Sequence, residues 1–230
     1  MRKVRAVACD IDGTITDSRR LIQANGIEAL RKLQERGTMV MIASGNVLPV
    51  AFGLSTYIGT NGPVIAENGG IVYYQGRAYQ LQSNELPLKA YAYLKEEMPE
   101  VERLFSDNWR LTEVALKRSL DLEKIRRILD GWGLEIEATG FAIHLMNKGH
   151  SKLAGVEKSC ELLGITPGEV AAIGDSDNDA KMLAGCGYGI AVGNASPSAK
   201  AAADFVAKGE HADGVIEGLR HIGLLDQTGQ

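Results

Sequence analysis

Cysteine is scarce in this sequence, and positive charge is not in excess. The 230 residues include three cysteines, which lie far apart and form no C-x-x-C pair, so neither a zinc site nor a disulfide framework is indicated. The formal net charge of -4 argues against a nucleic-acid-binding protein, because such proteins gain most of their affinity from lysines and arginines that neutralise phosphates. We therefore expect no nucleic-acid partner and a reducing compartment.

Long apolar segments are also missing. No run approaches the roughly 18 residues that a membrane span needs, so we expect no membrane partner. The apolar stretch 4–9 is interrupted by Arg5 and followed at once by Asp10, which makes it shorter than the apolar core of a signal peptide. These observations predict a cytoplasmic protein.

Glycine, in contrast, is abundant. There are 27 glycines spread along the chain, where the usual share of about 7% would give far fewer. Such a distribution indicates many tight turns between strands and helices rather than a low-complexity tract. The chain length suits one large domain or two small ones.

Apolar runs alternate with helical patterns at both ends of the chain. Residues 4–9, 38–43 and 170–173 are short apolar runs, typical of strands that are buried on both faces of a parallel sheet. Residues 21–36 and 151–163 have helical spacing and are followed by a glycine. The sequence therefore predicts an α/β fold: a Rossmann-like parallel-sheet core with helices on both faces, built from residues 1–82 and 151–230.

The middle of the chain has a different pattern. Residues 83–150 contain short alternating segments and two helical stretches, which together predict an inserted α+β cap domain. The expected helices and strands of this insertion are 86–98, 111–116, 122–129, 134–138 and 141–146.

Three of the expected core strands end in polar clusters. These clusters are Asp10-Ile11-Asp12, Ser44-Gly45-Asn46 and the acidic segment 175–179. An aspartate after a strand is commonly just a turn or helix-capping residue, but parallel strands bring their carboxyl ends to one crevice, where ligands bind. Clustered carboxylates repel one another unless a cation lies among them, and hard oxygen ligands suit Mg²⁺.

In order and spacing, these motifs resemble those of the phosphatases of the haloacid dehalogenase superfamily, along nearly the whole chain. The motif D-x-D-G-T is present as residues 10–14, Ser44 closes a strand, Lys152 precedes a helix after the insertion, and G-D-x-x-N-D is present as residues 174–179. A lone D-x-D-G-T is moderately specific, whereas the ordered set of four is strong.

The resemblance implies a chemical role for each acidic residue. Asp10 would attack phosphorus and form an aspartyl-phosphate, and the carboxyl of Asp12 would protonate the leaving alkoxide and then deprotonate water. Asp10, Asp175, the backbone carbonyl of Asp12 and Asp179, directly or through water, would hold the Mg²⁺ cofactor.

The resemblance also implies a phosphate-binding set. Ser44 would hydrogen-bond a phosphoryl oxygen, helped by the backbone N–H groups of Gly45 and Asn46, and the glycine allows a close approach of the backbone. Lys152 would neutralise the phosphoryl group and Asp10, and Asn178 would hold Lys152 or the phosphate in place.

A phospho-receiver signalling domain is the alternative from another class of function. Such domains also place an acidic cluster, a hydroxyl residue, a lysine and Mg²⁺ on a parallel sheet, but they are much shorter and carry adjacent acidic residues in the first cluster. Within the superfamily, a dehalogenase would leave Asp12 idle, because its reaction forms no alkoxide. The inserted domain and the spaced D-x-D favour a phosphatase acting on a small phosphorylated metabolite.

The substrate is the least defined part of the prediction. The segment 56–70 is most similar to archaeal-type phosphoglycolate phosphatases, which implies 2-phosphoglycolate as the substrate; the alternative is a sugar-phosphate or general metabolite phosphatase. A homodimer is a further expectation. Four cationic residues of the insertion are candidates to bind the glycolate carboxylate, although each is more typical of a solvated surface charge: Arg103, Arg110, Lys117 and Arg118.

Overall fold

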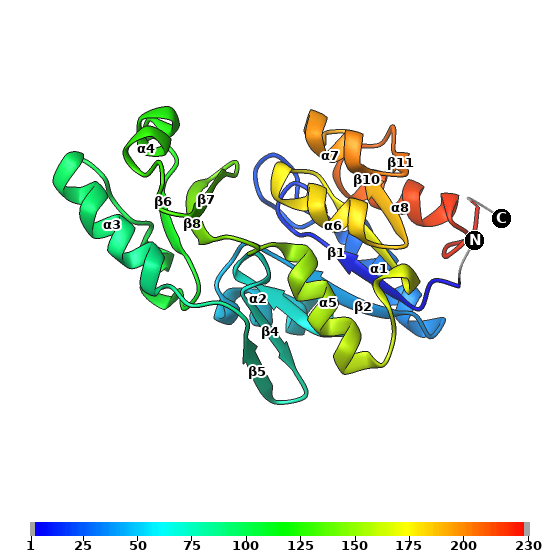
Figure 1. The fold of residues 1–230 in the computed structure, drawn as a ribbon. Coiled ribbons are helices and arrows are strands. Elements are labelled where there is room, and N and C mark those ends of the chain that lie inside the picture. Colours follow the sequence, from blue (N-terminus) through cyan, green and yellow to red (C-terminus); the bar gives the residue numbers. More distant parts are fainter. Residues whose placement is uncertain (1–2, 228–230) are drawn as a thin grey trace.

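An eight-stranded, mostly parallel sheet forms the larger part of the computed structural model, which describes residues 3–227 (Figure 1). The strand order is β11-β10-β9-β1-β2-β3-β4-β5, and all pairings are parallel except those of β4 with β3 and with β5. The strands are β1 (Ala6–Cys9), β2 (Met39–Ala43), β3 (Val64–Ala66), β4 (Ile71–Tyr74), β5 (Arg77–Gln80), β9 (Val170–Gly174), β10 (Tyr188–Ala191) and β11 (Phe205–Val206).

The central strands are apolar at every position because both faces of the sheet are covered. Every residue of β1 and β9 is buried, and β1 lies between β2 and β9 in parallel register, with Cys9 opposite Ile42 and Ile173. A strand buried on both faces needs a continuous apolar run rather than an alternating one. The three core strands expected from such runs are confirmed, with ends that shift by one or two residues.

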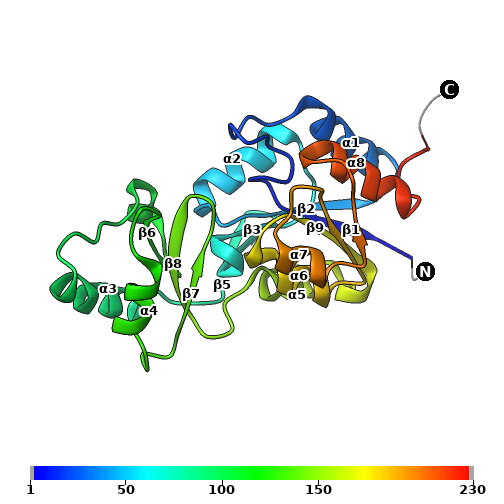
Figure 2. The same cartoon turned by 90° about the horizontal axis from the view of Figure 1, so that it is seen from above.

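Helices cover both faces of this sheet, as Figure 2 shows, and the α/β fold class is confirmed. On one face lie α1 (Ala24–Glu35), α2 (Leu48–Ile58) and α8 (His211–His221), and on the other lie α5 (Lys152–Leu163), α6 (Ala180–Gly185) and α7 (Pro197–Ala202). Four single-turn or slightly longer 3₁₀ helices occur at Glu67–Gly69, Phe105–Trp109, Pro167–Glu169 and Asp177–Asp179. Within residues 3–227, none of the helices has the length and apolar character that a bilayer crossing would need.

The first helix begins later than its apolar pattern suggests. The prediction of a helix over 21–36 is wrong at its start, because Ile22 forms an antiparallel bridge with Thr16 and the backbone N–H of Asp17 donates to the carbonyl of Leu21. Residues 16–22 thus form a short hairpin, and Arg20 in its turn has a φ of +64°. Apolar residues spaced for a helix can equally serve a hairpin that precedes it.

The insertion has its own sheet and its own core. Its three antiparallel strands are ordered β6-β8-β7, and the helices pack against one face of this sheet around Leu94, Leu116 and Ile143 (Figure 1). Its elements are α3 (Glu85–Glu97), β6 (Val114–Lys117), α4 (Leu122–Ile128), β7 (Leu134–Ala138) and β8 (Ala142–Asn147). That residues 83–150 act as a cap over the site stays a prediction, to which the site geometry below gives support.

Helix α5 packs so closely on the sheet that one of its positions requires glycine. Ser151 caps its N-terminus by accepting from the N–H of Ala154. One turn on, a Cβ at Gly155 would lie 2.4 Å from Cγ2 of Ile65 and 3.0 Å from the backbone of Gly69. This contact sets how deep the start of α5, and with it Lys152, lies.

We expect Gly155→Ala to lower the free energy of unfolding by about 1 to 3 kcal/mol, because the added methyl group overpacks this contact. Gly53→Ala in α2 is the matched control, since a Cβ there would meet nothing within 4 Å. The control should raise stability by about 0.5 to 1 kcal/mol, the usual gain in a helix interior. Urea denaturation followed by circular dichroism measures both; a stabilising Gly155→Ala would contradict the close packing.

Candidate active site

The polar tips of three neighbouring strands meet at the carboxyl edge of the large sheet. Asp10 follows β1, Ser44 follows β2 and Asp175 follows β9. The next strand along the chain, β2, pairs with one edge of β1, and β9 pairs with the other edge. These strand ends therefore lie where the strand order of the sheet reverses direction. Crevices of this kind are the ligand sites of open α/β sheets.

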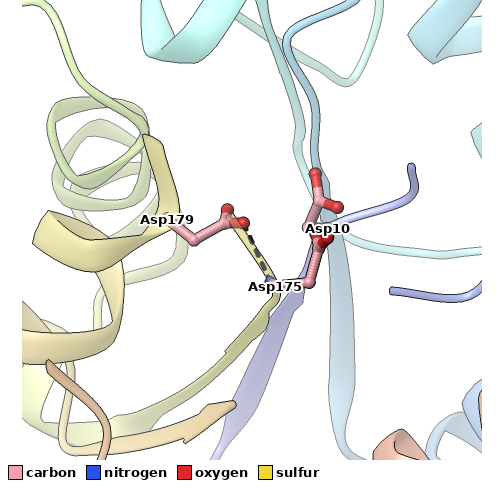
Figure 3. A group of neighbouring side chains, drawn as sticks. All are labelled: Asp10, Asp175 and Asp179. Carbon is pink, nitrogen blue, oxygen red and sulfur yellow. Dashed lines mark hydrogen bonds between the residues drawn. The ribbon is translucent and has the colours of Figure 1, made fainter. Parts of the chain in front are cut away.

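Three aspartates form one carboxylate cluster at this edge (Figure 3). Oxygens of Asp10, Asp175 and Asp179 all lie within 4.8 Å of one another. The hydroxyl of Thr14 donates to Oδ2 of Asp10 at 3.0 Å and lies 3.2 Å from Oδ1 of Asp175, which links two of the three. A Cβ at Gly13, whose φ is +86°, would lie 2.3 Å from Oδ2 of Asp175, so this loop position needs glycine.

Lys152 is buried between two of these carboxylates. Its Nζ lies 2.6 Å from Oδ1 of Asp10 and 2.7 Å from Oδ1 of Asp179, and its side chain is 1% exposed. Burial alone lowers the pKa of a lysine, but the two ion pairs outweigh it and raise the pKa of Lys152 above its ordinary value. The ammonium group therefore stays charged throughout the physiological range.

One ammonium does not balance three clustered carboxylates. Burial raises the pKa of Asp10 well above its ordinary value although Lys152 opposes the shift, and burial together with Asp179 raises the pKa of Asp175 to about 6. A divalent cation that prefers oxygen ligands fits this donor set, because it would neutralise the remaining charge. Oδ2 of Asp179 already accepts from the backbone N–H groups of Asp175 and Ser176. Asp10 and Asp175 are therefore the carboxylates better placed to hold such a cation directly.

The loop after β2 is shaped by short hydrogen-bonded contacts. Ser44 is fully buried, and its Oγ accepts from the backbone N–H of Asn46 at 3.0 Å and from the Asn46 side chain at 3.1 Å. A Cβ at Gly45 would lie 2.9 Å from Oδ1 of Asn68. The Asn46 side chain also donates to Oδ2 of Asp12 at 2.8 Å, which couples this loop to the first motif.

The carboxylate of Asp12 lies outside the three-aspartate cluster. Its Oδ1 accepts from Nε of Arg20 at 3.1 Å, and Asn46 holds its other oxygen. Asp12 and Asp10 line one cavity of about 270 Å³, together with Arg20 and the turn between β7 and β8 of the insertion. The side chain of Asp12 is therefore placed beside Asp10 and faces the space that a reacting group would occupy.

The sequence matches a known protein family along nearly its whole length. The family model of the haloacid dehalogenase-like hydrolases matches residues 7–113 and 114–219, nearly the whole chain. The chain belongs to this family. The membership decides against the receiver-domain alternative.

Curated relatives of this hydrolase span nearly its full length. It is 42% identical to a phosphoglycolate phosphatase of Methanopyrus kandleri, covering 94% of this chain and 96% of the relative. It is 38% identical to a phosphoglycolate phosphatase of Methanothermobacter thermautotrophicus, covering 94% of this chain and 98% of the relative.

Solved structures of the family share the fold of this hydrolase. The crystal structure of Thermoplasma acidophilum 0175 superposes with a TM-score of 0.89 at 30% identity, covering 97% of this chain and all of the other. A sugar phosphatase of subclass IIB superposes with a TM-score of 0.81 at 21% identity, covering 96% of this chain and all of the other, and at that identity the likeness concerns the fold alone.

Asn178 lies at the site with contacts that the sequence did not indicate. Its Nδ2 donates to Oδ1 of Asn68 at 2.9 Å, and its Oδ1 accepts from the hydroxyl of Ser176. Its side-chain hydrogen bonds thus go to these two residues rather than to Lys152. Asn68 belongs to the segment Glu67-Asn68-Gly69-Gly70, which forms a tight turn that is buried beneath the insertion.

A buried polar network joins the insertion to this catalytic edge. Arg110 donates to the carbonyl of Gly45 at 3.0 Å and forms an ion pair with Glu113. Glu113 also accepts from Asn68 at 2.9 Å and lies 3.1 Å from Nδ1 of His144. The interpretation of Arg110 as a solvated surface charge is wrong, because the residue is 4% exposed.

Glu67 anchors the same network from the core. Its carboxylate accepts from the backbone N–H groups of Leu111 and Thr112, at 3.0 and 2.9 Å, and from the Thr112 hydroxyl at 2.6 Å. These bonds keep Leu111 and Thr112 out of β6, so the strand expected over 111–116 begins only at Val114. No short sequence motif signals this network, because its members come together only when the insertion folds against the core.

The ionisation of Glu113 makes the stability of the protein depend on pH in the acidic range. Burial raises the pKa of Glu113, but His144 and Arg110 lower it further, and the net result is a pKa of about 2 in place of 4.5. Because the folded-state pKa lies below the ordinary value, the carboxylate stabilises the fold above pH 4.5, and this contribution is lost as the pH falls toward 2.

We expect Glu113→Gln to lower the free energy of unfolding by about 3 kcal/mol at pH 7, because Arg110 then lacks its buried partner. The difference from the wild type should shrink between pH 4.5 and pH 2. Urea denaturation across this range measures it, with the exposed Glu123→Gln as a control that leaves stability nearly unchanged at every pH. A Glu113→Gln effect independent of pH would show that the charge of Glu113 is not what stabilises the network.

Proposed function

We propose that this hydrolase is a Mg²⁺-dependent phosphatase that cleaves small phosphomonoesters through an aspartyl-phosphate on Asp10, with 2-phosphoglycolate as its leading substrate. The observation that carries the proposal is the placement of Asp10. This carboxylate is paired with a buried lysine, belongs to the cluster with Asp175 and Asp179, and lines the same cavity as the separately held Asp12. The candidate nucleophile and the candidate proton donor thus line one small cavity, and the charge-neutralising lysine contacts the nucleophile.

The residues of the chain support a two-step reaction. A carboxylate oxygen of Asp10 would attack phosphorus while the ester P–O bond breaks, and Asp12 would give its proton to the departing alkoxide. Asp12 would then take a proton from water as the water attacks the phosphoryl group, which releases phosphate and restores Asp10. The same residue serves as acid and base because the second step reverses the proton demand of the first.

Charge neutralisation makes the attack of one anion on another feasible. Lys152 supplies a permanent positive charge at Asp10. Mg²⁺, held by Asp10, Asp175, the Asp12 carbonyl and, directly or through water, Asp179, would supply the rest by neutralising the phosphoryl oxygens. Ser44 and the N–H groups of Gly45 and Asn46 would hydrogen-bond those oxygens, the Asn46 N–H by exchanging its contact with Oγ of Ser44. Asn178 would support this arrangement through Asn68.

The choice of 2-phosphoglycolate rests on relatives and on size. Relatives that match nearly the full length at 38% and 42% identity are named phosphoglycolate phosphatases. The cavity of about 270 Å³ is small for a ligand site and is partly closed by the insertion, which favours a small leaving group.

Comparing substrates tests this proposal. We expect kcat/KM for 2-phosphoglycolate to exceed that for a hexose phosphate and a nucleoside monophosphate by about tenfold or more, which corresponds to about 1.4 kcal/mol in transition-state binding. Asp10→Asn keeps the size of the side chain but removes the nucleophile, so its turnover should fall by roughly a thousandfold or more on every substrate. Phosphate release measures both.

The outcomes separate the parts of the proposal. A tenfold preference for a sugar phosphate would overturn the substrate and leave the phosphatase standing. Near-wild-type turnover by Asp10→Asn would overturn the mechanism.

We expect Asp175→Asn to weaken Mg²⁺ binding by about tenfold or more, because it removes a carboxylate from the cluster. Asp177→Asn is the matched control, because the carboxylate of Asp177 lies in the same loop but accepts hydrogen bonds from the hydroxyls of Ser196 and Ser198. Calorimetric titration of Mg²⁺ into each variant measures the affinity without any need for turnover. Equal affinities for the two variants would refute a ligand role for Asp175.

A further inference from the structure

Arg20 is a cationic side chain of the active-site cavity to which the reaction above gives no task. It comes from the turn of the 16–22 hairpin and lines the same cavity as Asp10 and Asp12. Among the described residues that line this cavity, it is the only lysine or arginine. The lining of the cavity therefore carries one permanent positive charge, that of Arg20.

The four cationic residues of the insertion that the sequence offers as candidates are engaged elsewhere. Arg103 pairs with Asp107, Lys117 pairs with Glu102, and Arg110 is buried against Glu113. Arg118 donates to the backbone carbonyl of Thr139. None of these four lines the cavity, so the sequence-based candidates for binding a substrate anion are replaced by a residue of the core.

The backbone at Arg20 is held in a conformation that arginine does not favour. Its φ of +64° lies in the left-handed region, where glycine or asparagine is the usual residue. The turn is closed by the N–H of Arg20, which donates to the carbonyl of Asp17 at 2.8 Å. Residues held in such unfavourable backbone conformations cluster at functional sites.

The guanidinium group of Arg20 is fixed from two sides. Its Nε and Nη2 lie 3.1 and 3.0 Å from one oxygen of Asp12, and its Cζ lies 4.9 Å from the centre of the Phe141 ring. Phe141 belongs to the β7–β8 turn of the insertion, so core and insertion together orient the group. A guanidinium has five N–H donors, and Asp12 engages one edge, while the side chain remains 58% exposed.

We propose that Arg20 is a specificity residue that binds a carboxylate of the substrate located one carbon from the ester oxygen. This inference rests on the proposed function. Asp12 must reach the ester oxygen to protonate it, and in 2-phosphoglycolate a single methylene separates that oxygen from the carboxylate. A guanidinium in contact with Asp12 is therefore within reach of this carboxylate.

The chemistry of the group suits this task. The planar guanidinium offers paired N–H donors that match the two oxygens of a carboxylate, and Phe141 fixes its plane without taking up a donor. A neutral sugar hydroxyl in the same place would form a weaker hydrogen bond with the guanidinium than a carboxylate does. The arrangement thus selects small acidic phosphate esters over neutral ones.

A purely supporting role makes a different prediction. If Arg20 serves only to orient Asp12, its loss will impair proton transfer for every substrate alike. The comparison therefore needs two esters with the same leaving atom: 2-phosphoglycolate, and 2-hydroxyethyl phosphate, in which a hydroxymethyl group replaces the carboxylate.

We expect Arg20→Met to lower kcat/KM for 2-phosphoglycolate by about tenfold to a hundredfold more than for 2-hydroxyethyl phosphate, the usual effect of losing a charged hydrogen bond. Arg20→Lys, which keeps the charge but not the paired donors, should fall between. Inhibition of 2-hydroxyethyl phosphate turnover by glycolate should weaken in parallel. Arg19→Met is the matched control, because this neighbour pairs with Asp17 at the surface and is 77% exposed.

The rates on the two esters distinguish the possible roles of Arg20. An equal loss on both esters, with unchanged glycolate inhibition, would overturn the specificity role and assign Arg20 to the support of Asp12. A wild-type enzyme that hydrolyses both esters equally would overturn the inference while leaving the phosphatase intact. A wild-type enzyme that hydrolyses neither would instead refute 2-phosphoglycolate as the substrate, the part of the proposed function on which this inference rests.

Discussion

The ion pairs of Lys152 are the interaction on which the arrangement of the site depends. A buried ammonium group is costly unless it is paired, and here it has two carboxylate partners from different parts of the chain, Asp10 after β1 and Asp179 at the start of α6. Lys152 itself begins α5, so one charged atom ties together three segments: Asp10 lies 142 residues before the lysine and Asp179 lies 27 residues after it. Helix α5 can bring the lysine to this depth only because glycine, not a larger residue, faces Ile65.

This arrangement leaves the site with a built-in excess of negative charge. The lysine compensates part of it, and the raised pKa values of Asp10 and Asp175 express the remainder. A stable fold would not keep such a cluster without reason, because replacing a buried charged group by an apolar one often costs nothing. The unbalanced negative charge favours the binding of a cation at this site, and that cation can in turn bind an anionic substrate.

The sequence alone was sufficient for the parts that depend on local pattern. Apolar runs that end in Asp10, Ser44 and Asp175 identify the central strands and their shared edge, since a parallel sheet places those ends together. Contacts that depend on distant segments could not be predicted in this way. Arg110 is buried because it meets the carbonyl of Gly45, 65 residues earlier in the chain, and Arg20 enters the cavity because residues 16–22 turn back on themselves. Neither the spacing of apolar residues nor the residue type predicts such long-range contacts.

The anchoring of the insertion on Glu67 has a consequence for its modularity. By its sheet and core the insertion is a separate unit, yet the segment that leads into β6 is bound by a carboxylate and an amide that belong to the core, those of Glu67 and Asn68. An exchange of insertions between family members at the obvious connections near 82 and 150 would leave these two buried groups without partners. The unit that keeps these contacts is therefore larger than the visible domain, because it includes the turn at 67–70.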